Sequence, residues 1–198
     1  DDFRSRDTYV FPDIMRDYHQ KLTSDLFSAF QDFILQVKFP FCANERKILI
    51  NKEATFLTFN YTNTLERLYN VSCDKIIYIH NSAFDRSEKI ILGHGINPDM
   101  LMKTKTPEPP GNLSSNKMKE WYESNSQDYS YEEGKKTLLR YFKYTYKTTN
   151  QIICKHSGFF KSLKSVDTVY VLGHSISSVD IPYFEEIVNN IKVDTKWI

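Results

Sequence analysis

The chain has 198 residues and a mass of 23.4 kDa, which is the size of one domain and enough to bury a core. Its 26 Lys and Arg residues balance 25 Asp and Glu residues, so its charge gives no global argument for binding nucleic acid or an anionic membrane. No apolar run approaches the ~18 residues of a membrane span, and the charged first residues lack the apolar run of a signal peptide. We therefore expect a globular cytoplasmic protein.

The first third of the chain predicts a helix followed by a strand, a turn and a second helix. Apolar residues recur every three or four positions from Asp13 to Val37, which is the spacing of one face of an amphipathic helix. The β-branched and aromatic run at residues 54–59 predicts a buried strand. Asn63 and Glu66 then have the spacing of a capping box, so we expect the second helix to begin at Asn63.

The middle of the chain predicts two more strands and a long surface excursion. The apolar runs at residues 75–80 and 89–92 read as strands, the first ending at His80 and the second entering a turn at Gly93–Gly95. Residues 103–131 contain Pro107, Pro109 and Pro110 before a stretch rich in Ser, Asn, Lys and Glu, which predicts a long surface loop or insertion.

A basic amphipathic helical segment is predicted at residues 131–160. Lys136, Arg140, Lys143 and Lys147 share one face of this helix, which is a physically sensible arrangement for binding phosphates. A solvated face opposite the apolar stripe explains the same pattern, because long Lys side chains cover a helix at little cost. Both interpretations of this basic face stay open at this point.

Residues 168–198 predict a strand, a helix and the beginning of another strand. The run at residues 168–175 reads as a strand with a turn, Asp180 and Pro182 mark a helix start, and residues 194–198 resemble a further strand. Strands separated by helices indicate an α/β fold with a largely parallel sheet. Because ligands bind at the carboxyl ends of such strands, the polar turns found there predict one assembled site.

Three familiar motifs are incomplete in this sequence. A nucleophile elbow at Ser175 would need a later histidine, but His174 is the last one in the chain. The segment Gly134–Thr137 lacks the first glycine of a P-loop, and Pro98 takes the third glycine position of a dinucleotide fingerprint at Gly93. These motifs predict neither a serine hydrolase nor a standard phosphate loop.

A metal site is a further alternative at the same turns. His80, His94, His174 and Asp99 could gather at one sheet edge as ligands. Their spacing follows no metal-binding motif and no Cys pair supports them, so we predict no metal site.

Four segments, taken in order, resemble the AbiH family of bacterial abortive-infection proteins. They are FLTFNYTNTLERLY, IIYIH, ILGHG and VYVLGHSISSVDIPYFEEI, and the resemblance covers roughly residues 50–198. That family in turn resembles the sirtuin-like NAD-binding fold. The resemblance implies a Rossmann-like α/β domain, with a mostly parallel sheet flanked by helices, and a role in phage defence.

The resemblance also implies roles for individual residues. It assigns catalytic roles to Asn60, which would hold the nicotinamide ribose, and to His80, the general base on that ribose. A neutral histidine near pH 7 suits such a base. The implied cofactor-binding residues are Tyr61, Thr62, Gly93, His94, Gly173, His174, Ser175 and Asp180.

We therefore expect a phage-defence protein that binds NAD or a related nucleotide and hydrolyses the nicotinamide–ribose bond of NAD. A non-catalytic nucleotide- or partner-sensing module and a toxin acting on RNA or DNA stay open as alternatives. Expected partners are a nucleotide ligand, a phage-derived trigger and a second copy of the chain, with no membrane. Because the family pattern begins with a strand and a glycine-bearing nucleotide loop that are not found here, we expect residues 1–198 to be a fragment of a single sirtuin-like domain.

Overall fold

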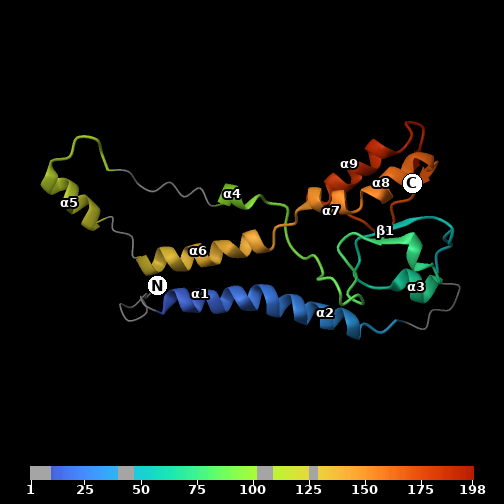
Figure 1. Cartoon of the computed structure of the whole chain (residues 1–198), viewed down its shortest axis with the longest axis horizontal. Helices are drawn as coiled ribbons and strands as arrows, with labels where there is room; N and C mark the ends of the chain where they lie inside the picture. Colours follow the sequence, from blue (N-terminus) through green and yellow to red (C-terminus); the bar gives the residue numbers. More distant parts are fainter. Residues whose placement is uncertain (1–9, 40–46, 102–108, 125–128) are drawn as a thin grey trace. The chain divides into compact units, whose positions relative to one another are not determined.

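A computed structural model of the chain describes residues 10–39, 47–101, 109–124 and 129–198. The described residues form helices and short parallel strands, which confirms a mixed α/β protein (Figure 1). The chain divides into two compact units. One comprises Asp1–Leu26 with Ile96–Tyr146, and the other comprises Phe27–Gly95 with Lys147–Ile198.

The first unit is helical. It contains α1 (Phe11–Gln20), a π-helical stretch η2 (Lys21–Asp25), α4 (Pro98–Leu101), α5 (Ser115–Ser124) and α6 (Tyr129–Tyr144). Helices α1 and α6 run parallel and in contact, because a Cβ at Gly134 would overlap the ring of Phe11 and the rings of His19 and Tyr144 are 6.1 Å apart. Gly134 thus lies inside a helix, where it permits close helix packing.

The second unit contains both pairs of strands. Its elements are α2 (Leu26–Gln36, of which Leu26 belongs to the first unit), β1 (Phe56–Thr58), α3 (Thr64–Tyr69), η4 (Cys73–Lys75), β2 (Ile76–Tyr78), α7 (Thr149–Lys155), α8 (Ser157–Ser162), η5 (Leu163–Ser165), β3 (Thr168–Val169), α9 (Ile181–Asn190) and β4 (Lys196–Trp197). β1 pairs in parallel with β2, and β3 with β4. Among the described residues these form two separate two-stranded sheets, where the sequence predicted one largely parallel sheet.

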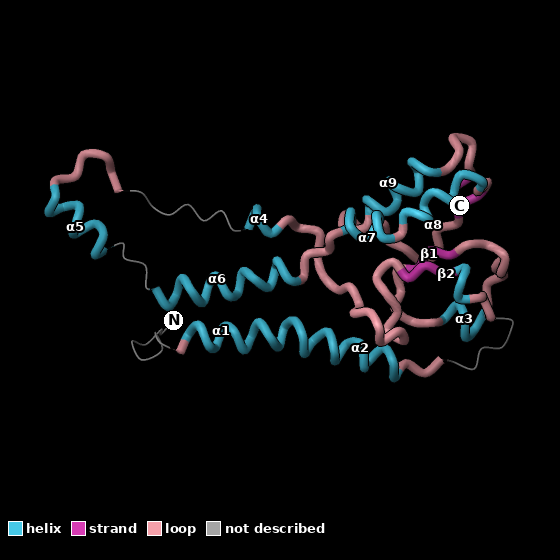
Figure 2. Tube along the Cα trace, viewed as in Figure 1, coloured by secondary structure: helices cyan, strands magenta, loops and turns pink. Residues whose placement is uncertain are grey.

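The core of the second unit lies between its strands and helices α7–α9. Its buried members are Ile79, Ile152, Phe160, Leu163, Tyr183 and Ile187. Leu57 of β1 packs against this cluster, while the hydroxyl of Tyr78 in β2 donates to a carboxylate oxygen of Glu66 in α3 at 2.7 Å. β1 and β2 therefore lie between the α7–α9 group and α3 (Figure 2). Their carboxyl ends bring residues 59–61 and 79–81 to one edge.

Two local predictions are wrong. Residues 89–92 form no strand, because the backbone groups of Ile91 make other hydrogen bonds than those of a strand ladder. Its N–H donates to the His80 carbonyl at 2.9 Å, and its carbonyl accepts from the Tyr61 hydroxyl at 2.8 Å. The capping box is also not formed. Asn63 does occupy the N-cap of α3, but its side chain makes no capping hydrogen bond, and Glu66 binds Tyr78 instead.

Other predicted elements keep their places with altered bounds. The helix predicted at residues 13–37 is confirmed, since residues 11–36 are helical throughout. The surface excursion predicted at residues 103–131 stays a prediction, since residues 103–108 and 125–128 lie outside the described residues and the rest contains α5 and the start of α6. The segment predicted as helical at residues 131–160 contains most of α6, all of α7 and the first part of α8. The described residues include no helix with the length and apolar character needed to cross a bilayer.

Candidate functional site

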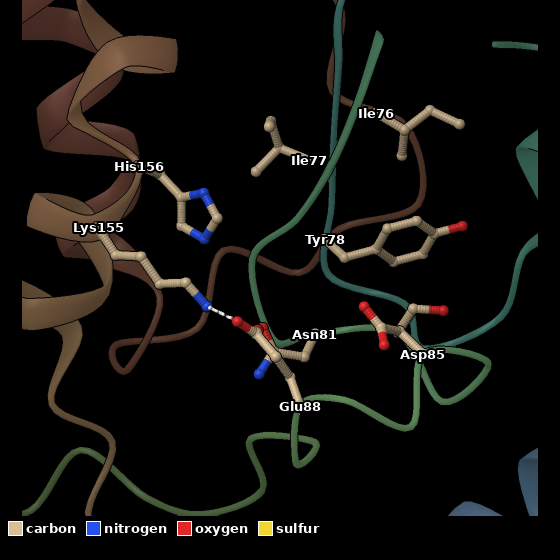
Figure 3. A pocket seen from close by; sticks show the side chains of 9 residues that line it. Ile76, Ile77, Tyr78, Asn81, Asp85, Glu88, Lys155 and His156 are labelled. Atoms are coloured by element: carbon tan, nitrogen blue, oxygen red, sulfur yellow. Dashed lines mark hydrogen bonds and ion pairs between the residues drawn. The ribbon is translucent and has the colours of Figure 1, made fainter. Parts of the chain in front are cut away.

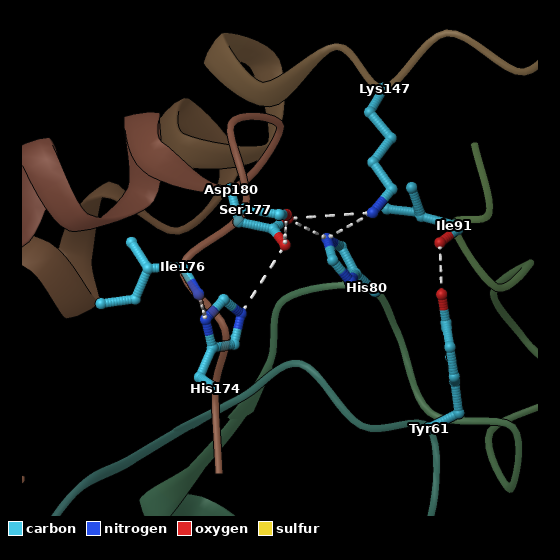
Figure 4. A network of polar contacts seen from close by, with 8 residues as sticks. All are labelled: Tyr61, His80, Ile91, Lys147, His174, Ile176, Ser177 and Asp180. Atoms are coloured by element: carbon cyan, nitrogen blue, oxygen red, sulfur yellow. Dashed lines mark hydrogen bonds and ion pairs between the residues drawn. The ribbon is translucent and has the colours of Figure 1, made fainter. Parts of the chain in front are cut away.

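Polar side chains from three separate segments of the second unit converge beyond the ends of β1 and β2 (Figure 4). They are His80 after β2, Lys147 before α7, and His174 with Asp180 before α9; we call these four residues the buried polar cluster. His80, Lys147 and Asp180 are 4%, 9% and 8% exposed. Lys147 Nζ lies 3.4 Å from His80 Nε2, and each of these atoms lies 3.8 Å from Asp180 Oδ1.

Asp180 is the common partner of the cluster. It is the N-cap of α9, as predicted, yet its side chain makes no capping hydrogen bond. The Ser177 hydroxyl donates to Asp180 Oδ2 at 3.0 Å, while Oδ1 is buried and has no hydrogen-bond partner among the described residues. Because buried acceptors are normally satisfied, Oδ1 is a place where a hydrogen-bond donor is expected.

His80 is enclosed by aromatic rings. The ring centroids of Phe59, Tyr183 and Tyr61 lie 5.5, 5.9 and 6.3 Å from its own. Burial lowers the pKa of His80 to about 4, and the neighbouring Lys147 ammonium adds to this, whereas Asp180 and a backbone hydrogen bond with Phe59 oppose it. His80 is therefore uncharged near pH 7, in the state that a proton acceptor requires.

His174 is held by a strained turn. Gly173 has a φ of +66° and Ile176 a φ of 50°, a region that β-branched residues rarely adopt. The Ile176 N–H donates to His174 Nδ1 at 2.8 Å. In the uncharged ring the proton is then on Nε2, which lies 3.6 Å from Asp180 Oδ2. The turn thus aims a ring N–H at the carboxylate.

Three other predicted residues contact the edges of this region. The Tyr61 hydroxyl donates to the Ile91 carbonyl, and burial, with a smaller effect of Asp180, raises its pKa to about 12. The Thr62 hydroxyl lies 2.8 Å from that of Thr64. The His94 carbonyl accepts a hydrogen bond from the Lys147 N–H at 2.9 Å, which ties the Gly93–Gly95 turn to Lys147.

The remaining predicted residues are exposed and take no part in the contacts that join the cluster. They are Asn60, Gly93, Gly173 and Ser175. The Asn60 N–H donates to the Thr58 hydroxyl at 3.1 Å, so its position at the end of β1 is fixed by its own strand. The structure therefore brings His80, His174, Asp180 and Tyr61 together but leaves the second predicted catalytic residue, Asn60, at the surface.

Sequence reasoning missed three members of the site. Lys147 was predicted on a basic helical face; that placement is wrong, since α6 ends at Tyr144 and Lys147 is buried. No sequence signal marks it. Ser177 could have been found, because its spacing to Asp180 is that of a capping pair. Tyr183 lies three residues after Asp180 on α9, and its ring packs against His80.

A separate cavity of about 270 Å³ lies beside β2 and the end of α7 (Figure 3). An ion pair between Lys155 and Glu88, with an N–O distance of 2.6 Å, forms part of its wall. The half-buried His156 also lines it, and burial lowers the pKa of that ring. No residue of the buried polar cluster lines this cavity.

Within the described ranges, no group of three His, Cys, Asp or Glu residues is arranged to hold a metal ion.

Comparison with known proteins adds a family assignment to this geometry. No curated protein and no solved structure matches the chain. The family described as Bacteriophage abortive infection AbiH matches residues 1–198. Because this match covers the whole sequence, the chain belongs to the AbiH family, which implies a role in abortive-infection defence against bacteriophage.

Proposed function

We propose that this AbiH-family protein binds NAD or a related nucleotide beside the buried polar cluster and hydrolyses the bond between nicotinamide and ribose. One observation carries the proposal: His80, at the end of a parallel strand, is buried and uncharged beside the carboxylate of Asp180. A ligand site at the carboxyl ends of parallel strands is the general rule for α/β proteins. The resemblance of the Asn60 and His80 segments to sirtuin-like, Rossmann-like NAD-binding proteins supports the same choice.

The proposed reaction needs few protein groups. Water replaces nicotinamide on the ribose carbon, giving ADP-ribose, neutral nicotinamide and one proton released to solvent, and the bond breaks through a state with positive charge on the sugar. His80 Nε2 accepts the proton of a ribose hydroxyl, which raises the electron density available to the sugar. The Asp180 carboxylate, 3.8 Å from that nitrogen, stabilises both the protonated ring and the positive sugar.

In this proposal three of the exposed predicted site residues, Asn60, Gly173 and Ser175, line the entrance through which the nucleotide reaches His80. Asn60 follows β1 and is accessible to orient the ribose. Gly173 and Ser175 are exposed next to His174, where a pyrophosphate can approach backbone N–H groups without a side chain at Gly173. Asn60 lies on the turn after β1, next to the turn after β2 that carries His80. Gly173 and Ser175 lie on the turn that carries His174, so one nucleotide would contact both turns.

A non-catalytic nucleotide-sensing role is the second candidate, and a specific observation favours it. His80 is only 4% exposed, and the Lys147 ammonium occupies the side of Nε2 that a substrate hydroxyl would need. In this alternative the nucleotide binds at the exposed turns and is released unchanged.

NAD loss in infected cells separates the two roles. Cells producing the wild-type protein, His80→Gln or the matched control His156→Gln are challenged with phage, and NAD is measured by an enzymatic cycling assay. We expect depletion with wild type and with the His156 variant, and at least a ~100-fold slower loss with His80→Gln, since general base catalysis contributes about 10²–10⁴-fold. Protection from phage without NAD loss would reject hydrolysis, and equal loss with His80→Gln would reject its catalytic role.

A further inference from the structure

Lys147 is the least expected residue of the buried polar cluster. A lysine only 9% exposed is uncommon, because burial of an ammonium group is costly unless it is paired. The contacts found for its Nζ are to His80 Nε2 at 3.4 Å and to Asp180 Oδ1 at 3.8 Å. Burial lowers the pKa of Lys147, while Asp180 opposes this. The Lys147 side chain and the Asp180 carboxylate thus face each other at 3.8 Å beside the imidazole.

The position of the ammonium decides which nitrogen of His80 carries a proton. An ammonium group has three donors and no acceptor, so the nitrogen facing it must present a lone pair. A backbone hydrogen bond with Phe59 also acts on the ring and favours its protonated form. The other groups around His80 are Asp180, His174, Tyr61 and Tyr183, and of these only Asp180 carries a full charge that attracts a ring N–H. Lys147 is nearer to Nε2 than Asp180 is, by 3.4 Å against 3.8 Å.

We propose that Lys147 is a positioning residue, whose ammonium group selects the tautomer of His80 that leaves the Nε2 lone pair available to accept a proton. This role rests on the proposed function, in which His80 Nε2 is the base. Without Lys147, the nearby Asp180 carboxylate would attract an N–H of the ring, and Nε2 would then carry the proton and could accept none.

Asp180 Oδ1 explains how Lys147 can leave Nε2 when a substrate arrives. Oδ1 is buried, has no hydrogen bond from the described residues, and lies 3.8 Å from Lys147 Nζ. A small rotation of the lysine side chain would close that distance to a hydrogen bond. A ribose hydroxyl could then take the place of the ammonium at Nε2, and the charge of Lys147 would stay paired throughout.

The tautomer of His80 can be measured directly by ¹⁵N NMR of the imidazole nitrogens at pH 7. In the wild-type protein we expect Nε2 to show the chemical shift of an unprotonated nitrogen and Nδ1 that of a protonated one. The reverse pattern in the wild type would overturn the proposal, and this test needs no variant to fold.

Variants then test whether Lys147 is the cause. In Lys147→Met we expect the tautomer with the proton on Nε2 and a rise of the His80 titration midpoint by about 1–3 pH units, the usual effect of losing a close charge. Lys155→Met is the matched control, since Lys155 pairs with Glu88 and should leave the His80 signals unchanged. Lys147→Arg should restore most of the wild-type pattern. An unchanged tautomer and midpoint in folded Lys147→Met would overturn the proposal.

Measuring NAD loss together with the NMR pattern separates the role of Lys147 from the proposed NAD hydrolysis on which that role rests. If wild-type protein shows no NAD loss but the NMR pattern is as expected, the proposed function fails and the placement of the proton stands. If NAD is lost but Lys147→Met shifts neither the tautomer nor the pH profile of that loss, Lys147 does not position the base.

Discussion

The buried, uncharged state of His80 predicts that the second unit loses stability as the pH falls. The pKa of this ring is lowered from its ordinary value of 6.5 to about 4 in the folded chain. Between these two values the unfolded chain binds a proton that the folded chain does not. The contribution of His80 is therefore fully present above pH 6.5 and is lost as the pH falls toward 4.

The magnitude follows from the size of the shift. One pKa unit corresponds to about 1.4 kcal/mol, so a shift from 6.5 to about 4 corresponds to about 3 kcal/mol in the free energy of unfolding. Carboxylates elsewhere also titrate over this range, so the quantity to measure is the difference between wild type and His80→Gln. That difference should change by about 3 kcal/mol between pH 7 and pH 4, with the wild type losing more.

Urea unfolding followed by tryptophan fluorescence provides the assay. Trp121→Phe leaves Trp197, in β4 of the second unit, as the only tryptophan, so the signal reports the unit that contains His80. His156→Gln is the control, and its pH dependence should be smaller because that ring is more exposed. A wild-type minus His80→Gln difference that stays constant from pH 7 to pH 4 would refute the reasoning.

Three further predictions concern packing and pairing in the second unit. Asp180→Asn should lower the free energy of unfolding by about 3–5 kcal/mol, because it leaves Lys147 buried without its counter-ion. A double-mutant cycle with Lys147→Met, measured by urea unfolding, should show a coupling energy of about 1–3 kcal/mol. Additive effects of the two substitutions would contradict the pairing. Tyr183→Phe should leave the free energy of unfolding unchanged or raise it by about 1 kcal/mol, because the buried Tyr183 hydroxyl has no hydrogen-bond partner among the described residues. A destabilisation of more than about 1 kcal/mol in thermal unfolding would show that the hydroxyl has a partner. Phe160→Ala should cost about 3–5 kcal/mol, more than Phe159→Ala, since Phe160 is fully buried and Phe159 is not. Equal costs for the two would contradict the placement of the core.

The parts of the site that the sequence predicts are those defined by local patterns. Asn60 and His80 stand at the ends of apolar runs of strand length, and Asp180 precedes Pro182 at a helix start, while their roles are implied by the family resemblance. These signals depend on neighbours within a few residues. The structure places β1, β2 and the start of α9 as those patterns indicate.

The parts that the sequence does not predict depend on long-range contacts. Lys147 meets His80 across 67 positions of the chain, and nothing near Lys147 distinguishes it from the other lysines of its basic segment. The segment 89–92 has the composition of a strand, but its backbone binds the turn after β2 and the hydroxyl of Tyr61. Local propensity cannot decide between a strand partner and such contacts, because both satisfy the same backbone groups.

The measurement that tests the central claim most directly is a crystal structure of the protein with ADP-ribose bound. We predict a ribose hydroxyl within about 3 Å of His80 Nε2, the reach of proton transfer, with the Lys147 ammonium moved onto Asp180 Oδ1. ADP-ribose bound elsewhere, for example in the cavity beside Lys155 and His156, with His80 Nε2 still facing Lys147, would contradict it.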